Sequence, residues 1–157
     1  MKILIVARHG YYRGSDLHEI GELQMKALGS AIKSALNGFS VQIVSSNAPR
    51  AEQSAEIIAE ILGVGFEKHE FLWTGPGSPR GCSPDLQSAL KLIEASKADV
   101  LIIVTHLEYS EKLPNFFGRN VLKVSSFPSE ETDKGHAWVI DCEAKTCTKL
   151  APELLKE

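Results

Sequence analysis

Short apolar runs alternate with amphipathic segments along most of this chain. Three runs are apolar and rich in β-branched side chains, as is typical of strands buried on both faces: residues 2–7, 41–44 and 100–104. Three further segments repeat apolar residues at helical spacing: residues 20–35, 49–62 and 86–93. Ser83-Pro84 has the order of an N-cap followed by a first-turn proline, which opens the last of these helices. Strands and helices in alternation predict a mainly parallel sheet.

The remaining segments predict shorter elements. Residues 66–72 favour an additional strand, residues 109–117 a short helix, and residues 135–140 with 146–150 a terminal hairpin. We therefore expect an α/β fold built as a three-layer sandwich, with helices on both faces and an antiparallel edge strand or hairpin at the C-terminus. No linker or internal repeat divides the sequence, so one domain over residues 1–157 is expected.

Composition and charge narrow the class of protein. The 157 residues, 43% of them hydrophobic, suffice for one full-sized core. The net charge of −3 argues against nucleic acid or an anionic membrane as the main partner. The first apolar run is too short for a signal peptide or a membrane span. Three cysteines without a Cys-x-x-Cys pair favour a reduced, cytoplasmic protein, and a pairing of Cys142 with Cys147 stays open.

Basic and imidazole side chains follow the three strongest strands. Arg8 and His9 end the first, Arg50 lies in the first turn of the helix after the second, and His106 comes just after the third. Because carboxyl ends of parallel strands meet at one sheet edge, these side chains should lie close together. Guanidinium groups bind phosphate oxygens in a bidentate manner, and an imidazole can attack phosphorus. The sequence therefore predicts a phosphoryl-transfer site.

The same segments resemble the histidine phosphatase (phosphoglycerate mutase-like) superfamily. The resemblance covers roughly residues 1–110, and its motifs are Arg8-His9-Gly10, Ser45-Ser46 leading to Arg50-Ala51-x-Gln53-Ser54-Ala55, and Val104-Thr105-His106. The short length without inserted caps looks most like the small bacterial phosphohistidine phosphatases. The resemblance implies that His9 is the nucleophile that becomes phosphorylated, that Arg8 and Arg50 bind the transferred phosphoryl group, and that His106 hydrogen-bonds and stabilises it.

These four side chains are sufficient for phosphoryl transfer. Two guanidinium groups, an imidazole and a helix N-terminus can stabilise the charge of a phosphoryl-transfer transition state, so no metal ion or other cofactor is expected. His9 must be neutral to attack. We expect the nearby arginines to lower its pKa, and a hydrogen bond at its other ring nitrogen to fix the tautomer.

The general acid departs from the family pattern. Many members of the family place a glutamate where this chain has Thr74, and another branch places an aspartate directly after the second histidine, where this chain has Leu107. Glu70, Asp85 and Glu108 are the substitutes in this sequence, and the absence of any acid is the alternative. A site without an acid should favour phosphohistidine or aryl phosphate, whose leaving groups need little protonation, and it disfavours mutase activity.

The predicted function is thus hydrolysis of a phosphoryl group through a phosphohistidine intermediate on His9. A phosphorylated protein, carrying phosphohistidine, is the first substrate class, and a small phosphorylated metabolite is the alternative. A catalytically weak module that binds phosphorylated ligands is the alternative from another class.

Overall fold

The computed structural model describes residues 1–154 of the chain. A six-stranded sheet forms its centre, in the strand order β5-β4-β6-β1-β7-β8. The strands are β1 Ile3–Arg8, β4 Val41–Ser45, β5 Glu67–Lys68, β6 Val100–Thr105, β7 Ala137–Asp141 and β8 Thr146–Leu150. Strands β5, β4, β6 and β1 run parallel, whereas β7 is antiparallel to β1 and β8 to β7. The predicted mainly parallel sheet with a C-terminal antiparallel hairpin is confirmed.

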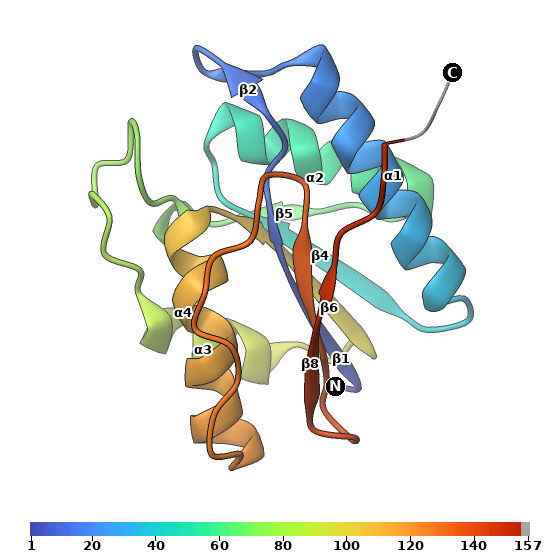
Figure 1. Cartoon of the computed structure of the whole chain (residues 1–157), viewed down its shortest axis with the longest axis vertical. Coiled ribbons are helices and arrows are strands. Elements are labelled where there is room, and N and C mark those ends of the chain that lie inside the picture. The colour runs from blue at the N-terminus through green and yellow to red at the C-terminus, as the bar shows by residue number, and fades with distance from the viewer. Residues whose placement is uncertain (155–157) are drawn as a thin grey trace.

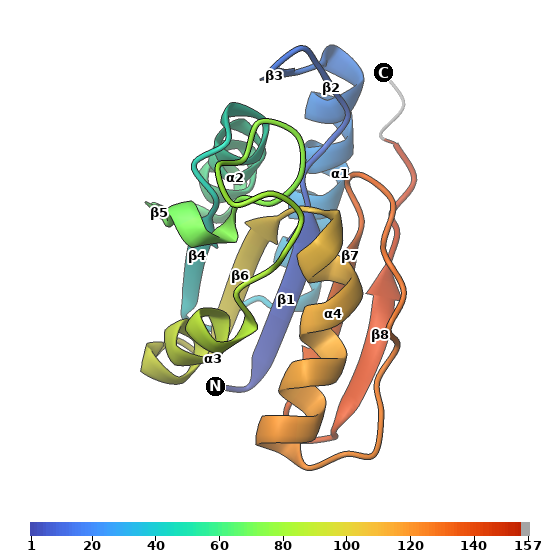
Figure 2. The ribbon, with the colours of Figure 1, turned by 90° about the vertical axis from the view of Figure 1, so that its left-hand side faces the viewer.

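Four helices cover the two faces of this sheet (Figures 1 and 2). Helices α1 Glu19–Ala35 and α2 Pro49–Leu62 pack together on one face, and α3 Leu86–Ala95 and α4 Leu107–Phe117 on the other. The helices predicted from apolar periodicity are all present. The three-layer α/β sandwich is therefore confirmed as well.

Two apolar cores lie on opposite faces of β1 and β6, because successive side chains of a strand point to opposite sides. Leu101 and Ile103 of β6 pack under α3 and α4, whereas Ile102 and Val104 pack under α1 and α2. Every residue of β6 is buried. This double burial explains why the strand reads as a continuous apolar run in the sequence.

A short two-stranded ribbon joins β1 to α1. Its strands are β2 Tyr12–Arg13 and β3 Asp16–Leu17, and they pair in antiparallel fashion. Gln53 of α2 holds the ribbon: its Oε1 accepts from the Leu17 amide at 2.6 Å, and its Nε2 donates to Asp16 Oδ1 at 3.0 Å. Gln53 thus ties the ribbon to α2.

The additional strand expected over residues 66–72 is mostly absent. Only Glu67–Lys68 pair with β4, and residues Glu70–Leu72 form a 3₁₀ helix, η1. Phe71 and Leu72 pack into the core under α3 and α4. Both apolar side chains therefore pack on the same side of the sheet, whereas successive side chains of a strand would point to opposite sides.

The boundaries of two helices also differ from the prediction. Asp85, not Ser83, caps α3, since its Oδ1 accepts from the Ser88 amide at 3.1 Å. Helix α4 begins directly after His106, includes Pro114, and continues as a π-helical turn, η2 Gly118–Leu122. The proline removes a backbone donor, which locally loosens a helix without ending it here.

The three cysteines are free thiols. In the β7–β8 hairpin, Cys147 is opposite Ile140, so Cys142 does not face it. Burial raises the pKa of Cys142 and raises that of Cys147 to about 12. Neither thiol is therefore placed to react with the other. Over residues 1–154, no helix combines the length and apolar character that a membrane crossing requires.

Candidate active site

The four side chains singled out in the sequence line one cavity at the carboxyl ends of the parallel strands. Arg8, His9, Arg50 and His106 all contribute to this cavity, whose volume is about 230 Å³. The parallel register of β1 and β6 pairs Arg8 with Thr105, so the next residue of each strand is a histidine. The His9 and His106 rings are accordingly 5.0 Å apart between centroids, in an edge-to-face arrangement.

His9 is buried and neutral, with a defined tautomer. Its Nδ1 lies 2.9 Å from the Gly10 carbonyl oxygen. Because a carbonyl only accepts, Nδ1 carries the proton and donates it, which leaves the lone pair on Nε2. Burial lowers the pKa of His9 to about 3, with smaller contributions from Arg50 and Arg8. The expected direction of the shift is thus found, but burial, rather than the arginines, is its main cause.

Gly10 fixes the backbone that carries His9. Its amide donates to Ser54 Oγ at 3.1 Å, and this hydroxyl donates in turn to the Arg50 carbonyl at 2.7 Å. A Cβ at Gly10 would lie only 2.7 Å from the backbone oxygen of Gly21, at the start of α1. Glycine is therefore needed for the close approach of these two segments.

His106 faces His9 from the N-terminal end of α4. Its Nε2 lies 2.8 Å from Ser46 Oγ, which also accepts from the Ala48 amide at 3.3 Å. Burial, followed by the proximity of His9 and Arg50, lowers the pKa of His106 to about 2. Ser46, which follows β4, thus links the end of β4 to the end of β6 through the His106 ring.

The two arginines supply positive charge with unused donors. Arg50 is 3% exposed, its Cζ lies 4.5 Å from the centre of the Tyr12 ring, and its Nη2 donates to the Pro76 carbonyl at 2.9 Å. Arg8 Nη1 donates to the Thr132 carbonyl at 2.9 Å. Among the described residues, the Nε atoms of both arginines are buried without a partner. Such buried donors suit an oxyanion ligand, and the N-terminus of α2 adds its dipole.

Lys134 was not recognised in the sequence, although it lines the same cavity. Its Nζ lies 6.0 Å from the centre of the Tyr12 ring. The next residue, Gly135, anchors the segment, because its amide donates to the carbonyls of Arg8 and His9. The lysine belongs to an irregular segment without apolar periodicity, so no pattern in the sequence could have placed it.

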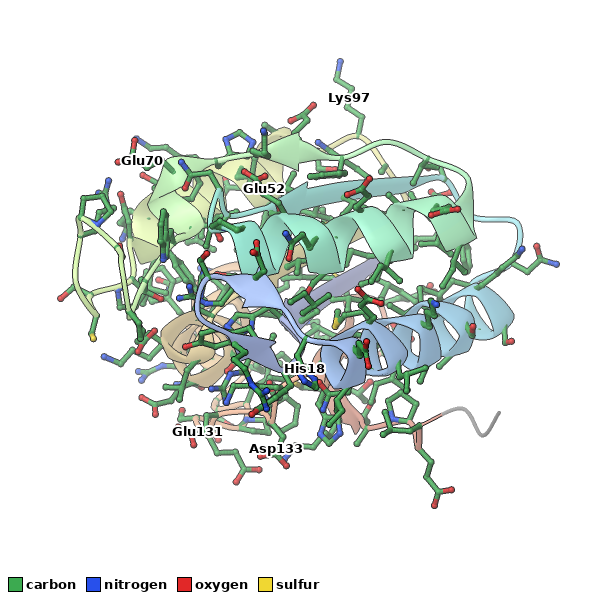
Figure 3. All side chains as sticks on the ribbon, turned by 90° about the horizontal axis from the view of Figure 1, so that it is seen from above. His18, Glu52, Glu70, Lys97, Glu131 and Asp133 are labelled. Carbon is green, nitrogen blue, oxygen red and sulfur yellow. The ribbon has the colours of Figure 1, made fainter. Side chains whose placement is uncertain are left out.

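The three candidate acids have different positions. Glu108 lines the cavity, and Thr74 Oγ1 donates to its Oε1 at 2.7 Å. Asp85 instead caps α3 and bonds Ser88, which together with the nearby Arg80 lowers its pKa. Glu70 is exposed and lies at the outer edge of the molecule (Figure 3). Glu108 is therefore the candidate that the fold brings to His9.

No cluster of three or more His, Cys, Asp or Glu side chains within residues 1–154 is arranged to hold a metal ion. The cavity around His9 contains one carboxylate and two imidazoles, and its cations are Arg8, Arg50 and Lys134. This arrangement is suited to binding and transferring an anionic group.

Comparison with known protein families gives a match to the N-terminal part of the chain. Residues 5–73 match the model of the histidine phosphatase superfamily, branch 1. A comparison with curated protein sequences found no match. The resemblance predicted from the sequence is confirmed over this segment, and it supports a phosphatase enzyme.

Solved structures share the fold along nearly the whole chain. The protein histidine phosphatase SixA, in complex with tungstate, is 16% identical, with a TM-score of 0.64 over 94% of either chain. A mycobacterial glucosyl-3-phosphoglycerate phosphatase is 17% identical, with a TM-score of 0.64 over 99% of this chain and 100% of its own. Phosphoglycerate mutase from Plasmodium falciparum is 19% identical, with a TM-score of 0.59 over 99% of this chain and 95% of its own.

Proposed function

We propose that this protein is a metal-independent phosphatase that forms a phosphohistidine intermediate on His9. The observation that carries the proposal is the state of that ring: neutral, buried, and hydrogen-bonded through Nδ1 to Gly10, so that Nε2 is the nucleophilic atom. A histidine with a free lone pair, beside two arginines with unused donors, is arranged for attack on a bound phosphoryl group.

The reaction proceeds in two steps. Nε2 of His9 forms a bond to phosphorus while the bond to the leaving group breaks, and water then attacks phosphorus and releases phosphate and His9. Arg8, Arg50 and His106 stabilise the negative charge of the phosphoryl oxygens in both steps. Their positions are fixed by Thr132, Pro76 and Ser46 before a ligand binds, so little reorganisation accompanies the reaction.

The substrate is a phosphorylated protein or a small phosphorylated metabolite. Solved structures of the same fold include a protein histidine phosphatase and a phosphatase of a phosphorylated sugar derivative. A cavity of about 230 Å³ has room for the phosphoryl group, whereas the rest of a substrate extends past Tyr12, Pro76 and Lys134. We infer the cytoplasm as the compartment, because free cysteines persist in a reducing environment.

The experiment that tests this proposal is the trapping of the phosphoenzyme. Wild-type protein quenched during turnover of 4-nitrophenyl phosphate should carry phosphate that is labile in acid, stable in alkali, and located on His9. His9→Ala should retain less than a few per cent of the activity. A chelator should leave wild-type activity unchanged. Activity in His9→Ala close to that of the wild type, or loss of activity with the chelator, would refute the mechanism.

A further inference from the structure

Glu108 and Thr74 form a hydrogen-bonded pair in the lining of the site, and the mechanism above does not use them. Within residues 1–154, Glu108 is the one carboxylate that lines the cavity of His9. It belongs to the first turn of α4, two residues after His106. The first turn of α4 therefore holds Glu108 close to His106, which caps the same helix.

The carboxylate is held from the opposite side by the loop that follows η1. Thr74 is fully buried, and its hydroxyl donates to Glu108 Oε1 at 2.7 Å. The adjacent Gly75, at φ +85°, brings its backbone so close that a Cβ would lie 3.6 and 3.9 Å from the two carboxylate oxygens. The negative charge of Glu108 also acts on Arg50, where it partly offsets the effect of burial on the pKa of the guanidinium. The carboxyl group of Glu108 is thus oriented by Thr74, and its charge interacts with the Arg50 guanidinium.

We propose that Glu108 is the proton donor to the leaving group, and that Thr74 is the residue that positions it. The proposal rests on the phosphatase function above and extends it. As His9 Nε2 bonds to phosphorus, the P–O bond to the leaving group breaks and Glu108 transfers its proton to that oxygen, which releases an alcohol. In the second step water bonds to phosphorus, the P–N bond breaks, and Glu108 accepts a proton of the water.

The proton balance closes over one cycle. A phosphate monoester has a second pKa of about 6, so the monoanion brings a proton into the site. That proton passes through Glu108 to the alcohol, Glu108 then takes a proton from the attacking water, and this proton leaves with the product as dihydrogen phosphate, so that Glu108 returns to its starting carboxylate. Water is the only co-reactant, and the products are an alcohol and phosphate.

A proton donor changes the substrate class that the site favours. Alkoxides are poor leaving groups and need a proton as the bond breaks, whereas phosphohistidine and nitrophenyl phosphate do not. With Thr74 in the place of the usual glutamate, the sequence alone predicted a preference for the latter. With Glu108 as the acid, phosphate monoesters of aliphatic alcohols become the substrates for which the site is equipped.

The decisive measurement is kcat/KM for 4-nitrophenyl phosphate, phenyl phosphate and β-glycerophosphate. Glu108→Gln, which keeps the size of the side chain, should lower the rate on β-glycerophosphate by roughly 10²- to 10⁴-fold and that on 4-nitrophenyl phosphate by less than about tenfold. Glu111→Gln is the matched control, since Glu111 lies on the same helix and lines a different cavity. It should leave every rate unchanged.

Thr74 is tested by a pair of variants. Thr74→Val removes the hydroxyl at constant shape and should cost roughly tenfold on β-glycerophosphate, whereas Thr74→Ser should restore the rate. A phosphoseryl peptide, compared with β-glycerophosphate, distinguishes a protein source of the ester from a small one. Glu108→Gln should still form the phosphoenzyme with 4-nitrophenyl phosphate and should accumulate it, because release to water is also slowed.

Three outcomes would overturn the proposal. They are an equal loss on all three substrates in Glu108→Gln, an unchanged rate on β-glycerophosphate in that variant, and a wild-type rate on this ester more than about a hundredfold below that on 4-nitrophenyl phosphate. In each case a phosphoenzyme on His9 would leave the phosphatase function itself intact. Failure of the wild type to form any phosphoenzyme would instead refute both.

Discussion

Arg50 is held in place by groups other than the ligand. Its Cζ lies 4.5 Å from the centre of the Tyr12 ring and 5.9 Å from that of the Trp73 ring. Its Nη2 donates to the Pro76 carbonyl at 2.9 Å. Stacking on aromatic rings and a fixed hydrogen bond suit the planar guanidinium better than a lysine ammonium. The orientation of Arg50 is thus set by the protein itself, as that of Arg8 is by the Thr132 carbonyl.

Removal of this side chain should weaken anion binding strongly. We expect Arg50→Ala to lower the affinity for orthovanadate by about 2 to 4 kcal/mol, the range for loss of one partner of a desolvated charge pair. Arg50→Lys should recover only part of this loss. Isothermal titration calorimetry measures the effect, with Arg13→Ala as the control, because Arg13 is exposed on the ribbon. Similar affinities for Arg50→Ala and wild type would show that Arg50 does not contact the anion.

At the scale of elements, the strand ends could be predicted, and the irregular segments could not. The apolar runs before His9 and His106 are long and doubly buried, so their ends mark the position of both histidines. Strand β5 was overestimated because only two of its residues pair with β4, too few to impose a period on the sequence. Lys134 could not be predicted from the sequence, because backbone hydrogen bonds of Gly135, rather than a helix or strand, bring it to the cavity.

The junction between β1 and α1 makes a further prediction at this scale. Gly10→Ala should destabilise the fold by about 1 to 3 kcal/mol, because the new Cβ would meet the Gly21 backbone at 2.7 Å. Activity should fall more than stability, since the shifted backbone carries His9. Gly65→Ala is the control, as no atom lies within 4 Å of its added Cβ, and it should be neutral. Chemical denaturation and turnover of 4-nitrophenyl phosphate give the two readouts, and an unchanged Gly10→Ala protein would contradict the close packing.

At the scale of the whole molecule, the two buried histidines of the site make the stability of the fold depend on pH. His9 and His106 are 3% and 2% exposed, and burial lowers their pKa from 6.5 to about 3 and about 2. Below pH 6.5 the unfolded chain binds a proton on each histidine that the folded protein does not bind. The free energy of unfolding therefore falls as the pH falls, and it is fully recovered above pH 6.5.

We expect a loss of about 1 to 2 kcal/mol per histidine between pH 7 and pH 5. Urea denaturation in a phosphate-free buffer at the two pH values measures it. The variant with both His9→Asn and His106→Asn should lose less stability over this range. Asp85 and Asp99, whose pKa values are lowered by hydrogen bonds with Ser88 and Ser40, are present in both proteins and cancel in the comparison. An equal loss in wild type and variant would refute the assignment.

The bond between Arg8 and the Thr132 carbonyl joins residues 124 positions apart. Translation from the N-terminus therefore produces Arg8 and His9, the proposed nucleophile, long before Thr132. The Thr132 carbonyl that orients this arginine, and the Gly135 amide that donates to the carbonyls of Arg8 and His9, are added only later. We therefore expect the site to assemble only after Gly135 has been translated, and a nascent chain that stops before Thr132 to lack the groups that orient Arg8 and His9.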